Sequence, residues 1–576
     1  MLRRLAAAPS LLVAGLLLFM AACGSAHRPA TNPGEVSGAA GAPRRAPEAR
    51  GGAGLAAEAR PAGLSPAFHR GRREALRQRL PPNSVAVFFA APPRLLAADV
   101  DYPFHQDPDF FYLTGLREPG AVLLLFAEAQ PAGPAGGPPI TEQLYVRPRD
   151  AYDEQWNGPR LGPAGAARIL AFGAVYPSTQ FVARPPDLSR FARVCWLLPR
   201  PGEDGRQTPT DSTELPDLRA AFERAARLPA AFNAPRTYAL AKLRERAVRE
   251  PNRPARWFEE FVVRQPLLLA EPAVRAWAVE PDSVKRQRLA TQYLATLPGP
   301  GRFDLTTLDN ALNELREIKQ PEELALLRYA IGVTVKGHRE VLKALTPEQS
   351  EADLDGLHQL VFRHYLARAD GYWPIVGSGA NGCVLHYIEN NRPRLGNDLV
   401  VMDVGAAYEG YTADVTRTAP ATGTFSPEQR LIYELVLAAQ EAGIRACRPG
   451  RDFYAPGQAA QKIIGAGLVK LGLISVADSA ARYFPHGTSH YLGLDVHDRG
   501  TYGPLRPNSV ITVEPGIYIP PGSPCDRRWW GIGCRIEDDI LITEKAPENL
   551  SSGVPRTVPE VEALIAEPSI WEQWRP

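Results

Sequence analysis

The stretch LVVMDVGAAYEGYTADVTRT, residues 399–418, decides the fold of the second half of the chain. Its apolar start predicts a strand that ends near Asp403. A Glu-Gly turn then leads into a returning strand that carries Asp414. Such a hairpin brings the two aspartates close together. Because a carboxylate buried without a partner costs several kcal/mol or takes up a proton, two of them on facing strands indicate a bound cation.

Three further ionisable residues follow in or beside predicted strands, and they extend this pattern: His490, Glu514 and Glu537. Four carboxylates and one imidazole are more charge than a protein interior holds uncompensated. Two divalent ions would neutralise the carboxylates, and donors of this kind suit Mn²⁺ better than a thiolate-rich zinc site would. The sequence therefore predicts a dinuclear metal site and, from it, a metallohydrolase.

Two other interpretations of these residues must be weighed. His486 and His490 have the spacing of the zinc motif HExxH, but Gly487 stands where that motif requires Glu. Glycine also disfavours a helix there, so a zincin is excluded. Arg535 and Glu537 share one face of a predicted strand, and an ion pair between them is the alternative to a metal role for Glu537.

Length and charge set broad limits on the protein. The chain has 576 residues and a net charge of +2. This length predicts two or three domains. The nearly balanced charge indicates neither nucleic acid nor an anionic surface as a partner.

The N-terminus has the features of a targeting segment. Two arginines precede an apolar run at residues 11–20, which is too short to span a bilayer. Small residues directly before Cys23 resemble the bacterial lipobox. We therefore expect a signal peptide of the lipoprotein type at residues 1–22 and lipidation of Cys23. An ordinary signal peptide cut after Ala22 is the alternative.

These features predict a lipoprotein of the bacterial cell envelope, which faces the periplasm or the exterior and meets the membrane only through its lipid anchor. Residues 23–64 are rich in Ala, Gly, Pro and Arg, with almost no large apolar residue. Such a stretch cannot offset its ordering entropy and predicts a disordered tether.

Five other cysteines remain, and their number is odd. No CxxC spacing occurs, which excludes a zinc ribbon or a thioredoxin-like motif. In an oxidising compartment Cys525 and Cys534 could pair, and buried free thiols are the alternative.

Two globular domains are expected after the tether. At 65–300, strands and helices alternate, which predicts an α/β domain, and a helix-rich stretch at 214–298 elaborates it without visible chemistry. At 301–576, helices are predicted to start at Pro321 and at Ser426, where Gln429 completes a capping box.

The five candidate ligands, in this order, resemble the metal-ligand set of the pita-bread metallopeptidases. Residues 102–115, 377–387, 490–498 and 531–539 are similar to bacterial aminopeptidase P, the Xaa-Pro aminopeptidase. The resemblance is weak at 200–300, which looks longer than in bacterial relatives. It implies an α+β fold, in which an N-terminal α/β creatinase-like domain precedes a C-terminal pita-bread catalytic domain.

The resemblance also implies an activity. Such enzymes release the N-terminal residue from peptides with proline in the second position, and a hydroxide that bridges two metal ions attacks the Xaa-Pro carbonyl. Asp414 and Glu537 would bridge the ions, with Asp403, His490 and Glu514 as further ligands. A homodimer or homotetramer is implied. A prolidase that cleaves only Xaa-Pro dipeptides and a non-catalytic pita-bread binding module remain as alternatives.

The same resemblance assigns roles to residues around the metal. His386 and His497 match two catalytic histidines beside the substrate carbonyl, and Arg535 matches an arginine that orients the site through Asp414 or its neighbours. Substrate contacts are implied for His486, Asp109 and Trp156, the last two from the first domain of a neighbouring subunit. Pro159 stands where relatives carry arginine, so one substrate contact is missing.

Overall fold

The computed structural model describes residues 60–98, 100–131, 137–198, 214–249, 258, 266–297, 299, 301–367 and 369–569. The predicted signal peptide, the predicted lipidation of Cys23 and most of the predicted tether lie outside these residues. From Arg60 onward the chain forms one compact unit. No helix within the described ranges is long and apolar enough to cross a membrane.

The end of the predicted tether is ordered against the rest of the protein, contrary to the prediction. The Tyr408 hydroxyl donates to the Pro61 carbonyl over 3.1 Å, and Leu64 packs against an apolar core. Ser65 then bonds Glu322 through both its backbone N–H and its hydroxyl. These contacts give residues 60–64 the partners that their composition did not predict.

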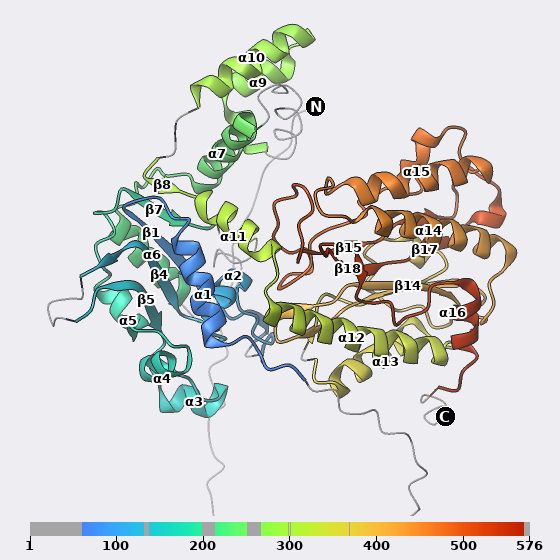
Figure 1. The fold of residues 1–576 in the computed structure, drawn as a ribbon, viewed down its shortest axis with the longest axis horizontal. Helices are drawn as coiled ribbons and strands as arrows, with labels where there is room; N and C mark the ends of the chain where they lie inside the picture. Colours follow the sequence, from blue (N-terminus) through green and yellow to red (C-terminus); the bar gives the residue numbers. More distant parts are fainter. Residues whose placement is uncertain are drawn as a thin grey trace, which may run out of the picture. The chain divides into compact units, whose positions relative to one another are not determined.

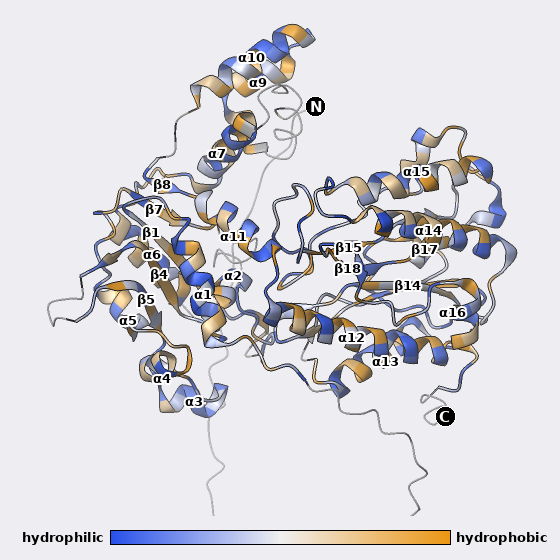
Figure 2. Ribbon diagram, viewed as in Figure 1, coloured by the Kyte–Doolittle hydropathy of each residue, from blue (hydrophilic) through white to orange (hydrophobic). Residues whose placement is uncertain are grey.

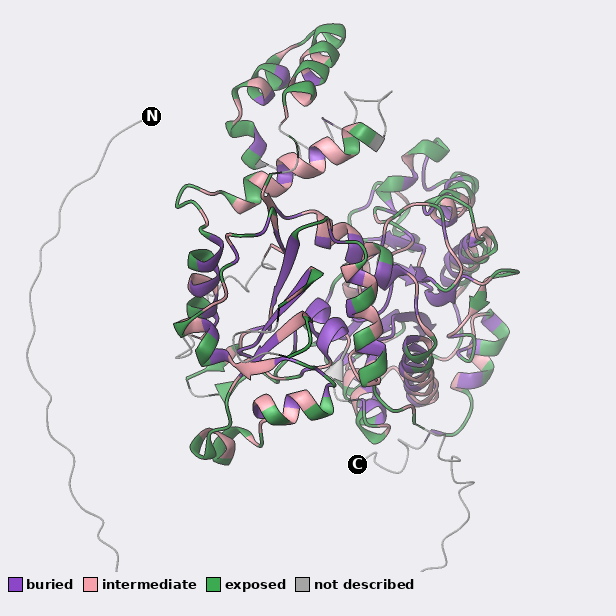
Figure 3. Cartoon of the chain, turned by 60° about the vertical axis from the view of Figure 1, so that its left-hand side comes forward, coloured by how far each residue is buried: buried purple, intermediate pink, exposed green. Residues whose placement is uncertain are grey.

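A six-stranded mixed sheet forms the centre of the first domain (Figure 1). β1 pairs antiparallel with β4 and parallel with β7. Val85 and Val87 of β1 face one apolar core, while Ala86 and Phe88 face another, so the sheet is covered on both sides (Figure 3). The strands, in sheet order, are β6 (Val175–Pro177), β5 (Ile140–Val146), β4 (Val122–Gln130), β1 (Ser84–Phe89), β7 (Arg193–Trp196) and β8 (Phe303–Asp304).

The helices of this domain cover its sheet, and one of them was not predicted. Ser65 caps α1 (Pro66–Arg77), because its side chain accepts from the Phe68 N–H. The aromatic cluster at 102–115 contains the unpredicted helix α2 (Pro108–Thr114), whose residues are all buried. The remaining elements are β2 (Leu95–Ala97), β3 (Val100–Asp101), α3 (Ala151–Asn157), α4 (Gly162–Ile169), α5 (Ser178–Ala183), α6 (Glu214–Ala226) and α11 (Thr307–Glu317).

The stretch predicted to be helix-rich is mostly helical where it is described, with non-helical connections at 227–233 and 280–282 between its helices. It has a small apolar core of its own, which includes Leu243, Phe258 and Trp277. After it, β8 pairs with β7. The first sheet therefore extends a few residues past the predicted boundary at 300. The helices are α7 (Ala234–Arg249), η1 (Pro266–Ala270), α9 (Pro272–Val279) and α10 (Ser283–Thr296).

Two helices of the second domain, α12 and α14, start where the sequence predicts (Figure 1). α12 has Pro321 in its first turn and a capping box that Glu323 completes. The capping box of α14 joins Ser426 and Gln429. The helices are α12 (Pro321–Ala344), α13 (Glu351–His364), α14 (Pro427–Ala446), α15 (Ala455–Lys470) and α16 (Val558–Ile565).

Short antiparallel strands lie between these helices and carry apolar side chains (Figure 2). The predicted hairpin is present, but its returning strand is interrupted, so Asp414 lies between two short strands. The strands are β9 (Ala369–Asp370), β10 (Ile375–Ser378), β11 (Leu399–Val404), β12 (Ala406–Tyr408), β13 (Tyr411–Thr412), β14 (Val415–Pro420), β15 (Val510–Val513), β16 (Gly516–Ile519), β17 (Ile532–Arg535), β18 (Asp538–Leu541) and β19 (Glu548–Asn549). Helices and mixed sheets together confirm the predicted α+β class.

One apolar core is shared by both predicted domains. It joins Phe110 of α2 with Leu327 of α12, and it includes Leu492 and Leu541 from the far end of the chain. The described cysteines are all free thiols, so the predicted alternative of a Cys525–Cys534 disulfide is wrong.

Candidate active site

The two predicted aspartates lie against one tyrosine. Asp403 stands near the end of β11, and Asp414 follows β13. The Tyr372 hydroxyl lies 2.5 Å from Asp403 Oδ1 and 2.6 Å from Asp414 Oδ1. Burial and the two carboxylates raise the pKa of this phenol well above its ordinary value. Because the hydroxyl carries one proton, it cannot satisfy both carboxylates at once, and the pair still needs a cation.

His490 faces the same point from the opposite side. Its Nε2 lies 3.3 Å from Asp414 Oδ2 and 3.6 Å from Glu514 Oε1. Its Nδ1 lies 3.1 Å from the Tyr491 carbonyl oxygen and donates to it in the neutral ring. This tautomer directs the Nε2 lone pair towards the carboxylates, the orientation of a metal-ligating histidine. Burial alone lowers the pKa of His490, but the Asp414 contact outweighs it and raises the pKa to about 9.

The remaining predicted ligand, Glu537, lies between β17 and β18. Thr416 donates to its Oε2 over 2.5 Å. Single ligand atoms of Asp414, His490 and Glu537 lie within 4.8 Å of one another, a spacing that fits one metal ion. Burial and the Asp414 charge raise the pKa of Glu537 well above its usual range.

The cluster holds more negative charge than its neighbours neutralise. Burial raises the pKa of Glu514 to about 7. Asp539 was not predicted; its Oδ2 accepts from the Asp414 N–H over 3.1 Å, while its Oδ1 has no hydrogen-bond partner. Burial and Asp414 raise the pKa of Asp539 as well. Oxygen donors with one oriented imidazole therefore fit divalent cations.

Arg535 is the cation built into this cluster. Its Nη2 lies 2.5 Å from Asp403 Oδ2, and its Nε donates to Thr416 Oγ1 over 3.1 Å. The predicted orienting contact is thus made to Asp403, a neighbour of Asp414. Within the described residues Arg535 forms its ion pair with Asp403, and the alternative pair with Glu537 is absent.

Three histidines border the cluster. The His497 ring centroid lies 4.2 Å from that of His490, and its side chain is exposed. His386 is also exposed and is close enough to lower the pKa of both His486 and His497. His486 Nε2 lies 2.9 Å from the Tyr518 hydroxyl, and burial lowers its pKa to about 4. Burial is the main cause that lowers the pKa of both His486 and His497, so these two rings are uncharged at neutral pH.

A cavity of about 1600 Å³ opens beside His497. Its walls include Phe111 of the first domain, Asn313 of α11 and Lys242 of α7, together with second-domain residues such as Ala407 and Tyr454. The two predicted substrate contacts of the first domain do not line it. Asp109 is buried against arginines, and Trp156 on α3 is 72% exposed.

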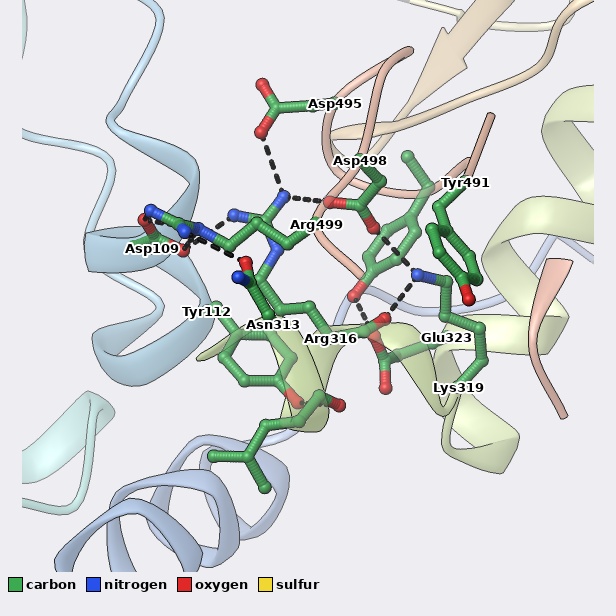
Figure 4. Close-up of polar contacts among 12 residues, drawn as sticks. Asp109, Tyr112, Asn313, Arg316, Lys319, Glu323, Tyr491, Asp495, Asp498 and Arg499 are labelled. Atoms are coloured by element: carbon green, nitrogen blue, oxygen red, sulfur yellow. Dashed lines mark hydrogen bonds and ion pairs between the residues drawn. The ribbon is translucent and has the colours of Figure 1, made fainter. Parts of the chain in front are cut away.

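A network of charged residues beside the cavity was not predicted (Figure 4). Arg316 and Arg499 both bind Asp109. Arg316 also binds Asp498, next to His497. These partners are 182 to 390 residues apart in the chain, so no local pattern could reveal them. Tyr372 escaped prediction for the same reason.

Two family models match the chain. Residues 325–544 match the model described as Metallopeptidase family M24. Residues 69–193 match the model described as Aminopeptidase P, N-terminal domain. The first match contains every candidate metal ligand and the second contains α2, so the two models divide the site as the structure does.

The chain is also similar to curated proteins and solved structures. It is 33% identical over 514 residues to the Xaa-Pro aminopeptidase of Escherichia coli, covering 86% of this chain and 96% of that protein. The Xaa-Pro aminopeptidase of Haemophilus influenzae is 31% identical over 508 residues, with the same coverage. Aminopeptidase P from E. coli with the inhibitor Pro-Leu has a TM-score of 0.66 at 31% identity, covering 88% of this chain and 99% of that chain.

Proposed function

Since this chain belongs to the Xaa-Pro aminopeptidase family of metallopeptidases, we propose that it releases the first residue of peptides that carry proline in the second position. The buried cluster around Asp414 carries this proposal, because its carboxylates exceed the available protein cations. A cluster of that kind is stable at neutral pH when metal occupies it.

Five residues would hold two divalent ions: Asp403, Asp414, His490, Glu514 and Glu537. Mn²⁺ is the metal we favour, because the donors are oxygens and one imidazole with no thiolate. When bound, ions of this kind would lower the pKa of a water molecule and polarise the substrate carbonyl. The protein's own part is orientation: Tyr372 and Arg535 keep the aspartates in place.

The histidines would serve the substrate. His386 and His497 are exposed beside the cluster, where each could donate a hydrogen bond to the reacting carbonyl oxygen or move a proton. His486 is neutral at physiological pH, and Tyr518 connects it to Arg535. We therefore propose that His486 orients the substrate.

A second copy of the chain would complete the first-domain contacts. Trp156 is exposed together with Tyr152, and their ring centroids lie 6.3 Å apart. An exposed aromatic pair of this kind suits an interface. We propose a homodimer or homotetramer in which Trp156 reaches a neighbouring site. We also propose a domain division near residue 300. We further propose a location in the cell envelope through lipidated Cys23, and this proposal rests on the sequence alone.

Hydrolysis of Xaa-Pro-Yaa tripeptides tests the function. The form starting at Arg60 is stripped of metal and then supplied with Mn²⁺, beside an Asp414→Asn variant. We expect Mn²⁺-dependent release of the first residue that the variant lacks. Turnover of Xaa-Pro dipeptides alone would identify a prolidase. No turnover with any divalent ion would leave only a binding protein.

A further inference from the structure

Arg499 stands two residues after His497 and connects its loop to α2 and α11 (Figure 4). Its Nε and Nη2 bind the Asp109 carboxylate on α2, at 2.9 and 2.7 Å. Its Nη1 lies 2.7 Å from Asp309 Oδ1 and 3.1 Å from Asn313 Oδ1, both on α11. The whole guanidinium group is thus engaged by two helices that precede it by 186 to 390 residues.

These contacts are largely buried, which restricts the geometry that they can adopt. The Asp109 side chain is 1% exposed and that of Arg499 is 18% exposed. A planar guanidinium bound in a fork fixes orientation in a way that an ammonium does not. Burial lowers the pKa of Arg499, but Asp109 outweighs it and raises the pKa, so the arginine stays charged.

The same loop has two further anchors, one on each side of His497. Asp498 binds both Arg316 and Lys319, with its Oδ2 2.7 Å from Lys319 Nζ. Asp495 binds Arg316 over 3.0 Å. By contrast, within the part of the chain that the structure describes, no hydrogen bond holds the His497 ring itself. The ring's position therefore depends on the residues around it.

The helix-rich stretch at 214–298, for which the sequence predicted no chemistry, supports this arrangement. Asp309 receives Lys242 Nζ over 2.6 Å and the Tyr238 hydroxyl over 3.2 Å, both from α7. Burial raises the pKa of Asp309, but Lys242 and Arg499 outweigh it and lower the pKa. α7 thus holds a carboxylate ionised for Arg499.

We propose that Arg499 is a positioning residue: by anchoring its loop to α2 and to Asp309 on α11, it sets the place of His497 at the metal centre. This inference rests on the proposed function and concerns how the chain orients one of its catalytic groups. Arg499 contacts none of the predicted metal ligands. It lines the cavity beside His497, where Asp109, Asp309 and Asn313 already hold its guanidinium group. Its effect is expected on turnover more than on binding.

Kinetics of Arg499→Gln test the role, with Arg430→Gln as the matched control at an exposed α14 ion pair. We expect kcat to fall about 10- to 100-fold, the range for a misplaced reacting group, while KM and bound metal change little. Arg499→Ala should regain part of its kcat when guanidinium ion is added at millimolar concentration. Arg499→Lys should recover less, because it keeps the charge without the fork.

A double-mutant cycle and amide exchange separate positioning from general destabilisation. Arg499→Gln combined with Asp309→Asn should lose little more than Arg499→Gln alone, since both remove one interaction. Hydrogen–deuterium exchange at 491–500 should accelerate in Arg499→Gln, with and without metal, and should stay unchanged in Arg430→Gln.

Three results would overturn the proposal. The first is an unchanged kcat, and the second is unchanged exchange at 491–500. The third is a loss of activity that follows metal content or melting temperature and that guanidinium does not rescue. If the wild type cleaves no Xaa-Pro peptide, the proposed function fails as well, and exchange alone then decides whether Arg499 anchors the loop.

Discussion

Single side chains determine whether the carboxylate cluster can accept metal. Among the residues that the structure describes, Tyr372 is the one neutral donor that meets both Asp403 and Asp414. Partners of this kind orient metal ligands, and their loss typically costs 10- to 100-fold in affinity or activity. The sequence placed the candidate ligands because carboxylates at strand ends are conspicuous. It could not place Tyr372, which stands 31 residues from Asp403 in an irregular segment.

Tyr372→Phe should therefore weaken Mn²⁺ binding by about 10- to 100-fold while the protein stays folded. Isothermal titration calorimetry measures the affinity, and circular dichroism checks the fold. Tyr365→Phe is the control, because the Tyr365 hydroxyl has no hydrogen-bond partner. Equal affinity in both variants would remove Tyr372 from the metal site.

Protonation of the ligands gives metal binding a predictable pH dependence. Glu514, with its pKa near 7, and His490, with its pKa near 9, both hold protons that a metal ion must displace. Apparent affinity should therefore rise as pH increases from 6 to 9, and binding should release protons. Calorimetry in buffers of different ionisation enthalpy counts these protons, and a count of zero at pH 7 would contradict the assignment.

At the scale of elements, local signals were reliable and long-range ones were not. The starts of α12 and α14 agree with their proline and capping-box signals. α2 was missed because its seven residues are almost all apolar and show no helical face. The interruption at Asp414 was missed because the alternation of the returning strand continues through it.

The packing of α1 on α2 makes stability sensitive to acid. Burial lowers the pKa of His69 to about 4, and its Nδ1 lies 2.9 Å from the Tyr112 carbonyl oxygen. The unfolded histidine takes up its proton near pH 6.5, so folding loses stability as pH falls from 6.5 to 4. The loss from this one group is about 3 kcal/mol.

His69→Gln should keep the contact with Tyr112 without titrating. Relative to the variant, the wild type should lose about 3 kcal/mol of unfolding free energy between pH 7 and pH 4. Urea unfolding of the metal-free protein at several pH values measures it. A difference that does not vary with pH would show that His69 is not buried as a neutral ring.

At the scale of the whole molecule, the two predicted domains are joined more closely than their sequence boundary suggests. Phe110, Leu327 and Leu541 meet in one core. Sequence patterns mark where apolar faces lie but not which faces meet, because that choice depends on the complete fold. The sequence predicted two domains but did not predict the core that they share.

The first described residues contribute to this joining. A chain that starts at Arg60 should match the full-length protein in activity, whereas one that starts at Pro66 loses the Ser65 cap and its bonds to Glu322. We expect the shorter chain to be less stable by about 1–2 kcal/mol. Urea unfolding compares the two, and equal midpoints would show that Ser65 contributes nothing.

The contact between Asp109 and Arg499 also has a consequence during synthesis. The two residues are 390 positions apart, so at 5–20 residues per second the ribosome delivers Arg499 about 20–80 s after Asp109. Throughout that interval Asp109 lacks this counter-charge. The apolar surface of α2 also lacks the strands against which it packs, because they have not yet been synthesised. We therefore expect the nascent first domain to expose the apolar surface of α2 to chaperones until the segment around Arg499 emerges.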